Sequence, residues 1–545
     1  MDVAFGTVWE AVATRLPQEV AVCEPGARWT YAEFDDRAAR LATALESAGV
    51  RAGDTVACYL YNGSAYLETV FAAFKLGAVP VNANYRYTSA ELTSLLDDAG
   101  AAAIVFSGPL APNVTHAAEH LPALRLLVRD GDAPDGDPGP EAADLAETRR
   151  ATPPRPHVPR PGSDRLFMYT GGTTGRPKGV VWQQADLLHS IAVAVFGPLG
   201  RAAPPTDLDD AVELAVAART GDRSPATLPV VPLMHGTGLF NTLGALLVGG
   251  RAVLTRPGRL DPRHVWETVA AERAGTIVVA GNAVAVPLVD ELVRAERAGA
   301  PHDLSSLQVV LSSGTALGDR AKQALHERTD VTITDAIAAS EGGPFAFAVT
   351  RSVQDLPSTF RPVPATRLIT DDGRVLPPGE SGTGALAYRG PLPLGYHGDA
   401  ERTAATFRIV DGVRYAVPGD LAELTPDGAI RFLGRGAGVI NTGGEKVHPQ
   451  EVEDVLLTDP AVADCVVVGV PDPVWGERVT AVVASPGAGP ELPERLRGLV
   501  RAALAGFKVP RVVVVVDELP RTPTGKIELA KARELAGAVP TRPSA

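Results

Sequence analysis

Short apolar runs alternate with alanine- and leucine-rich stretches between residues 20 and 127 of the chain. Strand-like runs at residues 55–61, 79–82 and 102–106 are separated by helix-like stretches at residues 67–76 and 90–99. This alternation is typical of βαβ units, in which parallel strands are joined by helices that cover the sheet. The pattern therefore predicts an α/β fold for this part of the chain.

The same alternation returns between residues 228 and 335, with buried strands predicted at residues 276–280 and 307–311. Between the two regions, residues 129–165 are rich in proline, glycine and aspartate and show almost no periodicity. Such a composition predicts a surface linker. After residue 369 turn sequences become frequent, which predicts antiparallel strands in a small barrel-like unit.

A last unit is predicted for residues 435–545, with strands at residues 465–470, 479–484 and 512–516. The third strand is a run of five valines, which would promote aggregation if it were exposed. We therefore expect it to be the buried central strand of a small sheet. The chain is thus predicted to contain a large N-terminal domain, residues 1–434, made of stacked βαβ subdomains and the barrel-like unit, followed by a small α+β C-terminal domain.

Composition and charge exclude some classes of protein but do not indicate an activity. A chain of 545 residues is too long for one hydrophobic core, so several domains or subdomains are expected. The formal net charge of −13 argues against a nucleic-acid-binding surface. The first residues lack the segments of a signal peptide, and the three cysteines are too scattered to predict disulfides or a zinc site. These features predict a soluble cytoplasmic protein without a membrane span.

Candidate chemistry begins with the glycine- and threonine-rich segment from Tyr169 to Gly179. An apolar run at residues 166–168 predicts a strand before it, and residues 180–193 predict a helix after it. Glycines let backbone N–H groups approach an anion, threonine hydroxyls donate hydrogen bonds, and Lys178 adds a positive charge. The segment lacks the ending of a Walker A loop. It suits a polyphosphate, although an isolated glycine-rich string is more often an ordinary turn.

Six further segments carry candidate functional residues. They are residues 228–238, which contain His235; residues 313–316; residues 334–342, which contain Glu341; residues 415–420, which end at Asp420; residues 434–453; and residues 523–526, which end at Lys526. Each alone has an ordinary explanation, since Pro-Gly-Asp is a turn and a lone histidine is usually a core residue. In this order and at these intervals, the segments resemble those of the adenylate-forming superfamily, which includes acyl-CoA synthetases, peptide-synthetase adenylation domains and firefly luciferase.

The resemblance covers residues 29–527 and implies ATP-dependent activation of an acid. An oxygen of the acid would attack the α-phosphorus of ATP, giving an acyl-adenylate and pyrophosphate, and CoA would then take the acyl group. The glycine-rich segment and residues 440–447 look most like the acyl-CoA ligases of bacterial fatty-acid and steroid side-chain degradation. ATP, Mg²⁺ and the cosubstrate CoA are therefore the expected small-molecule partners, and a homodimer is a family expectation.

The resemblance also implies roles for individual residues. Lys526 and Glu341 would stabilise charge during adenylate formation, Glu341 as the Mg²⁺ ligand, and His235 would close the acyl pocket near the carboxylate. The expected nucleotide- and CoA-binding residues are Thr170, Gly171, Gly172, Thr173, Thr174, Gly175, Lys178, Gly314, Thr315, Ala316, Asp335, Ile337, Ser340, Asp420, Arg435, Gly443, Gly444, Glu445 and Lys446. In the second half-reaction the mobile C-terminal domain would rotate about a hinge at Ala437, withdraw Lys526 and bring the last four of these residues to the site.

The chain departs from the superfamily pattern at three of these positions. Ile337 stands where most members have an aromatic residue, Ala338 where they have a glycine, and Ala437 where they have aspartate or lysine. Two other activities therefore stay open beside an acyl-CoA ligase. One is adenylation of a non-carboxylate acid such as nitrite with transfer to an aryl amine, which is the reaction of an ATP-dependent diazotase. The other is loading of a separate carrier protein. A non-enzymatic binding module is disfavoured because the charged site residues are retained.

Overall fold

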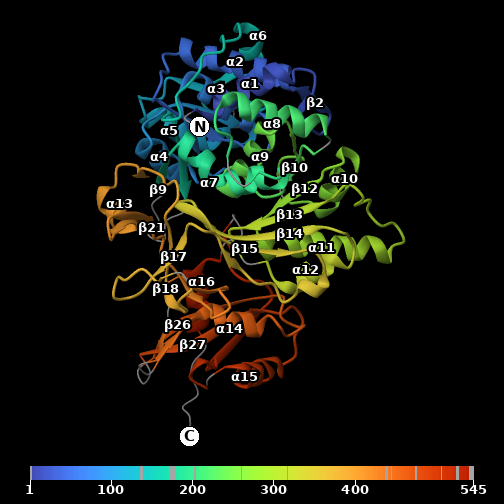
Figure 1. The fold of residues 1–545 in the computed structure, drawn as a ribbon, viewed down its shortest axis with the longest axis vertical. Coiled ribbons are helices and arrows are strands. Elements are labelled where there is room, and N and C mark those ends of the chain that lie inside the picture. Colours follow the sequence, from blue (N-terminus) through green and yellow to red (C-terminus); the bar gives the residue numbers. More distant parts are fainter. Residues whose placement is uncertain are drawn as a thin grey trace. The chain divides into compact units, whose positions relative to one another are not determined.

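Figure 1 shows the computed structural model of the chain, which folds into two compact units. The structure describes residues 3–134, 139–170, 178–201, 204–221, 223–258, 260–315, 317–377, 379–435, 438, 440–442, 445–472, 476–504, 506–522 and 527–538. Unit 1 consists of Met1–Ser358, Arg389–Arg408 and Arg414–Ala416, and unit 2 consists of Thr359–Tyr388, Ile409–Val413 and Val417–Ala545.

The first sheet of unit 1 contains the strands predicted near the N-terminus. Its strands are β3 (Thr55–Tyr59), β4 (Val79–Asn82), β5 (Ala101–Ser107), β6 (Leu126–Asp130), β7 (Ala143–Asp144), β8 (Arg165–Thr170), β9 (Lys178–Gln183) and β19 (Gly395–Tyr396). Their spatial order is β19-β9-β8-β4-β3-β5-β6-β7. The pairs from β8 to β7 are parallel, whereas β8–β9 and β9–β19 are antiparallel. The predicted alternation of strands and helices is therefore confirmed in this region.

Helices accompany these strands as the alternation predicts. They are α3 (Ser64–Leu76), α4 (Ser89–Asp98), α5 (Ala111–His120), α6 (Leu145–Ala151) and α13 (Ala400–Thr406). Helix α4 begins with a capping box, because the Thr88 side chain accepts from the Glu91 N–H and the Glu91 side chain accepts from the Thr88 N–H. The segment predicted as a surface linker, residues 129–165, contains the short strand β7 and the helix α6.

The second sheet of unit 1 is formed by both ends of the unit. Its strands are β1 (Val20–Glu24), β2 (Ala27–Thr30), β10 (Ala226–Pro229), β11 (Arg251–Val253), β12 (Thr276–Val279), β13 (Val309–Ser313), β14 (Thr332–Ala339) and β15 (Gly342–Thr350). Within unit 1 the order is β15-β14-β13-β12-β10-β11-β1-β2. The pairs from β14 to β1 are parallel, and the outer pairs β14–β15 and β1–β2 are antiparallel.

The remaining helices of unit 1 pack around the two sheets (Figure 1). They are α1 (Phe5–Arg15), α2 (Tyr31–Ser47), α7 (Gln184–Phe196), α8 (Leu208–Thr220), α9 (Gly236–Leu247), α10 (Pro262–Glu272), α11 (Gly281–Arg297) and α12 (Asp319–His326). Leucine, isoleucine and valine side chains from α10, α11, α12 and strands β10 to β14 form one continuous core. Within the described residues, no helix is both long enough and apolar enough to cross a bilayer.

The segment after the glycine-rich loop differs from its prediction. Residues 180–193 were expected to form one helix, but Lys178–Gln183 forms strand β9 and the helix α7 begins only at Gln184. Strand β9 pairs antiparallel with β8, with Thr170 opposite Lys178. The described residues on either side of the glycine-rich segment are therefore paired strands, and strand β9, not a helix, follows it.

Unit 2 begins with a small antiparallel sheet, as predicted. Its strands are β17 (Thr366–Ile369), β18 (Gly382–Tyr388), β22 (Asp420–Leu424) and β23 (Ile430–Arg435), paired in that order. The short strands β16 (Arg361–Pro362), β20 (Phe407–Val410) and β21 (Val413–Ala416) lie where the chain passes between the units.

The last part of unit 2 is a second sheet with three helices. Its strands are β24 (Ile440–Thr442), β25 (Glu445–Val447), β26 (Asp464–Asp472), β27 (Gly476–Ala484) and β28 (Val512–Val516), and its helices are α14 (Pro449–Leu456), α15 (Leu492–Ala503) and α16 (Leu529–Gly537). The five-valine strand β28 pairs with β27 alone among the described strands, so the expectation of a central strand is wrong.

The five valines are nevertheless protected. All are half-buried, and the last four alternate between two apolar clusters. Val513 and Val515 pack against a cluster that includes residues of α14 and α15, while Val514 and Val516 pack against one that includes residues of α16. Helices on both faces therefore explain an apolar run at the edge of the described sheet. The predicted domain boundary between residues 434 and 435 stays a prediction, and Ala437 lies outside the described residues.

Candidate active site

The hairpin that carries the glycine-rich loop is anchored on its first strand. The Tyr169 N–H donates to Asn82 Oδ1 over 2.6 Å, and Asn82 Nδ2 donates to the Tyr169 carbonyl over 2.8 Å. The Tyr169 hydroxyl donates to Asp98 Oδ2 over 2.5 Å, and burial raises the pKa of this hydroxyl so that it stays protonated. A Cβ atom at Gly179 would lie 2.7 Å from the Tyr169 ring, so the facing position on β9 requires glycine. Both strands are thus held in register up to Thr170 and Lys178, while Gly171, Gly172, Thr173, Thr174 and Gly175 lie outside the described residues.

Asn82 also connects this hairpin to the segment that contains His235. Its Nδ2 atom donates to the Met234 carbonyl over 2.7 Å, and the side chain is almost fully buried at the carboxyl end of β4. His235 follows as the N-cap residue of α9, with its own N–H donating to the Pro232 carbonyl. Sequence reasoning missed Asn82, although a polar residue ending an apolar strand was a usable signal.

The segment expected to lie along the purine is placed beside Ile337. Ser313, the last residue of β13, is paired with Ala336 of β14, and its hydroxyl donates to the Ala336 carbonyl over 3.1 Å. Gly314 has a φ of +92°, a conformation that favours glycine, and the Thr315 hydroxyl donates to the Ala280 carbonyl. The residues before Gly314 and Ile337 are therefore paired, while the contact of Gly314, Thr315 and Ile337 with a purine stays a prediction and Ala316 lies outside the described residues.

Asp335 is engaged by a lysine that the sequence reasoning did not identify. Lys322 of α12 is buried, and its Nζ lies 3.1 Å from Asp335 Oδ2 and 2.8 Å from the Ser358 hydroxyl. Burial raises the pKa of Asp335, and the ion pair with Lys322 opposes that shift. The carboxylate therefore supports β14 from the side of α12, and its predicted contact with the nucleotide stays a prediction.

Ser340 and Glu341 form the turn between β14 and β15, and two side chains from the first sheet hold this turn. The Trp182 indole N–H on β9 donates to the Ser340 carbonyl over 2.9 Å. The Tyr396 hydroxyl on β19 donates to Glu341 Oε1 over 2.6 Å, and burial and the Glu341 carboxylate raise the pKa of this tyrosine. The Tyr396 ring centroid lies 5.9 Å from Lys178 Nζ. One strand pair thus supports both the end of the glycine-rich loop and the Glu341 carboxylate.

The remaining predicted residues belong to unit 2. Asp420 is the first residue of β22, is almost fully buried, and lies opposite Arg435 in the register of β22 and β23. Glu445 and Lys446 begin β25, which pairs antiparallel with β24. Gly443, Gly444 and Lys526 lie outside the described residues. The structure therefore places Asp420 beside Arg435, while the predicted meeting of the two units at one site stays a prediction.

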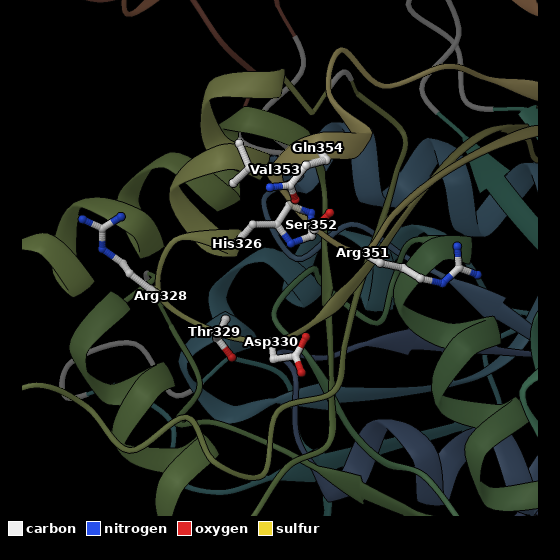
Figure 2. Close-up of a pocket in the computed structure, with 8 residues that line it drawn as sticks. All are labelled: His326, Arg328, Thr329, Asp330, Arg351, Ser352, Val353 and Gln354. Carbon is white, nitrogen blue, oxygen red and sulfur yellow. The ribbon is translucent and has the colours of Figure 1, made fainter.

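A separate polar pocket of about 480 Å³ lies elsewhere in unit 1 (Figure 2). Its lining residues are His326, Arg328, Thr329, Asp330, Arg351, Ser352, Val353 and Gln354. The Arg328 and Arg351 side chains point away from each other, and none of the predicted site residues lines the pocket. The pocket is therefore separate from the candidate site.

Unit 1 thus combines an α/β fold with a lysine, Lys178, and a carboxylate, Glu341, that both contact Tyr396. Comparison with known proteins gives the family. A model described as AMP-binding enzyme matches residues 9–397, and one described as AMP-binding enzyme C-terminal domain matches residues 451–526. The chain therefore belongs to the AMP-binding enzyme family.

Individual relatives agree with this assignment. The chain is 37% identical to medium-chain acyl-CoA ligase Mig of Mycobacterium avium, with 97% of each protein covered. It is 34% identical to 3-oxocholest-4-en-26-oate–CoA ligase of Rhodococcus rhodochrous, with 96% of this chain and 94% of that protein covered. The fold is similar to that of the anthranilate CoA ligase AuaEII in complex with anthranoyl-AMP, with a TM-score of 0.83, 24% identity and 98% of each chain covered. The predicted superfamily, the α/β fold class and the assignment to the AMP-forming ligases are confirmed.

Proposed function

We propose that this enzyme activates an apolar carboxylic acid with ATP and transfers the acyl group to CoA. The observation that carries the proposal is the support of Glu341 and Lys178 by the same strand pair, β9 and β19. Adenylate formation gathers negative charge on phosphoryl oxygens, and positioned cations and donors are the main means of stabilising it. The names of the relatives, which include medium-chain and steroid side-chain ligases, support an apolar acid.

The β8–β9 hairpin suits the departing pyrophosphate. Thr170 and Lys178 are paired at its described end, so the loop between them begins and ends at fixed positions. Backbone N–H groups and threonine hydroxyls of this loop would bind the phosphates without a helix dipole. The purine would lie against Gly314, Thr315 and Ile337, an apolar surface in place of an aromatic ring.

Glu341 has the chemistry that a Mg²⁺ ion requires. Its carboxylate is half-buried, and its Oε1 atom accepts a hydrogen bond from the Tyr396 hydroxyl. Its Oε2 atom makes no hydrogen bond within the described residues. A hard cation takes such an oxygen together with phosphate oxygens and water. When bound, Mg²⁺ would neutralise charge on the nucleotide phosphates, and the role of Tyr396 would be to keep the carboxylate oriented toward them.

Residues of unit 2 would complete the two half-reactions. Asp420 would accept hydrogen bonds from the ribose hydroxyls, with Arg435 beside it, and Lys526 would stabilise the charge of adenylate formation. After a rotation near Ala437, Gly443 to Lys446 would line the path of CoA. Lys526→Ala separates these roles, because it should abolish adenylate formation from ATP and spare thioester formation from a supplied acyl-adenylate. Equal loss of both reactions would contradict the assignment.

The proposed reaction is tested by measuring pyrophosphate release with a panel of fatty, aromatic and steroid side-chain acids, each with and without CoA. We expect release with apolar acids, and an acyl-CoA product only when CoA is present. A parallel reaction contains nitrite and aminoarenes in place of the acid and CoA. AMP formation with nitrite alone would identify a diazotase and overturn the acyl-CoA ligase proposal.

A further inference from the structure

Three potential metal ligands lie together on α5, and none of them belongs to the proposed nucleotide site. His116, Glu119 and His120 are all exposed, and one ligand atom from each lies within 4.8 Å of the other two. His116 shares one face of the helix with Glu119 and His120, which lie three and four positions further on, while Glu119 and His120 are adjacent in the chain. Within the part of the chain that the structure describes, no other group of three histidine, cysteine or acidic side chains meets this distance.

The hydrogen bonding of His120 prepares its ring for a metal ion. Its Nδ1 atom lies 2.7 Å from the His116 carbonyl oxygen. A carbonyl only accepts, so Nδ1 carries the proton and Nε2 keeps the lone pair that binds a metal. Histidine ligands commonly have such a second hydrogen bond, which sets the tautomer and the ring orientation. The His116 ring lies against that of His120, with ring centroids 4.0 Å apart and planes inclined by 39°, and a ring nitrogen of each lies within 4.8 Å of the other.

Charge at this position also favours a cation. His120 is the last residue of α5, where the helix carries partial negative charge, and Glu119 adds a carboxylate. Two imidazoles and one carboxylate match the ligands that Zn²⁺ takes, with water in the remaining position. Mg²⁺ prefers oxygen ligands and would not compete for the imidazoles.

We propose that His116, Glu119 and His120 form a surface site for a divalent transition-metal ion of the Zn²⁺ class. All three side chains are exposed, so an ion can reach the site from solvent. Its occupancy would tie the last turn of α5 together, next to α4, on which α5 packs. The site is independent of the acid activation proposed above, because it shares no residue with it.

The test uses full-length protein without a histidine tag, freed of metal by a chelator. Zn²⁺ binding is measured by competition with a chromophoric chelator near neutral pH, for the natural protein and for His116→Ala, His120→Ala and Glu119→Gln. We expect each histidine variant to lose one Zn²⁺ equivalent or to bind it at least about tenfold more weakly, and Glu119→Gln to weaken binding less. Co²⁺ should give the absorption of a four-coordinate site in the natural protein and lose it in the variants.

His264→Ala is the matched control, because His264 lies in the first turn of α10 and outside the cluster. It should keep the Zn²⁺ stoichiometry of the natural protein. Far-ultraviolet circular dichroism and the adenylation rate should be the same in all variants, which separates this test from that of the proposed reaction. Equal Zn²⁺ binding by the natural protein and the double variant His116→Ala/His120→Ala would overturn the proposal.

Discussion

Removing the hydroxyl of Tyr396 isolates the support of Glu341. Tyr396→Phe keeps the ring near Lys178 and the β9–β19 pairing, and it removes the 2.6 Å hydrogen bond to Glu341 Oε1 together with the hydroxyl's hydrogen bond with the Thr406 side chain. A hydrogen bond to a charged group contributes about 1.5–3 kcal/mol. Because Glu341 is half-buried and water can replace part of this contact, we take the lower value. A loss of about 1.5 kcal/mol corresponds to about a tenfold change in an equilibrium or rate constant.

The assay for this variant is ATP–pyrophosphate exchange measured over a range of Mg²⁺ concentrations. We expect the Mg²⁺ concentration for half-maximal exchange to rise about tenfold, because a carboxylate without its donor samples orientations that do not bind the cation. Mn²⁺ binding in the presence of ATP, followed by electron paramagnetic resonance, should weaken by a similar factor. Tyr85→Phe is the control, since its hydroxyl makes no hydrogen bond within the described residues. An unchanged Mg²⁺ requirement in Tyr396→Phe would refute the positioning role.

Two further substitutions test the loop anchor and a titratable group of unit 2. Asn82→Ala leaves the Tyr169 N–H and the Met234 carbonyl without the Asn82 side chain as their partner. The free energy of unfolding should therefore fall by about 1–3 kcal/mol, and the KM for ATP should rise. An unchanged KM for ATP would contradict the anchoring role. Desolvation raises the pKa of Glu453 from 4.5 to about 7, so its stabilising contribution is complete below pH 4.5 and is lost as the pH rises to 7. In the natural protein the free energy of unfolding should therefore fall by on the order of 2 kcal/mol between pH 5 and 8 because of Glu453, and in Glu453→Gln this fall should be absent. Thermal unfolding measured for both proteins over that pH range tests the prediction.

Periodicity predicts most of unit 1 because each buried strand and each amphipathic helix there has its own pattern. Strands β3, β4 and β5 and helices α3 and α4 lie within a few residues of their expected positions. The boundary between β9 and α7 was missed because apolar residues continue across Gln183 and Gln184 without glycine or proline. Local pattern does not distinguish a buried strand from a buried helix in such a run, and only the pairing with β8 decides it.

The candidate site likewise contains residues that the sequence identifies and residues that it does not. Residues in recognisable segments, such as Lys178, His235 and Glu341, are visible in the sequence because their neighbours share the pattern. Tyr396 is not, because a Gly-Tyr dipeptide has no distinctive composition and it lies 55 residues from its partner Glu341. Lys322 was missed for a similar reason, since nothing local shows that an amphipathic helix buries this lysine against Asp335.

The residues that the sequence motifs did not identify share one function. They join segments that each hold one part of the candidate site. Strand β9 pairs with β8 at the loop, with β19 through Tyr396, and contacts the Ser340 turn through Trp182. A displacement of β9 would therefore move Lys178, at the end of the glycine-rich segment, and the Glu341 carboxylate together. Substitutions within β9 should accordingly change ATP and Mg²⁺ requirements in parallel, whereas Tyr396→Phe should change the Mg²⁺ requirement first, because it leaves the strand pairing in place.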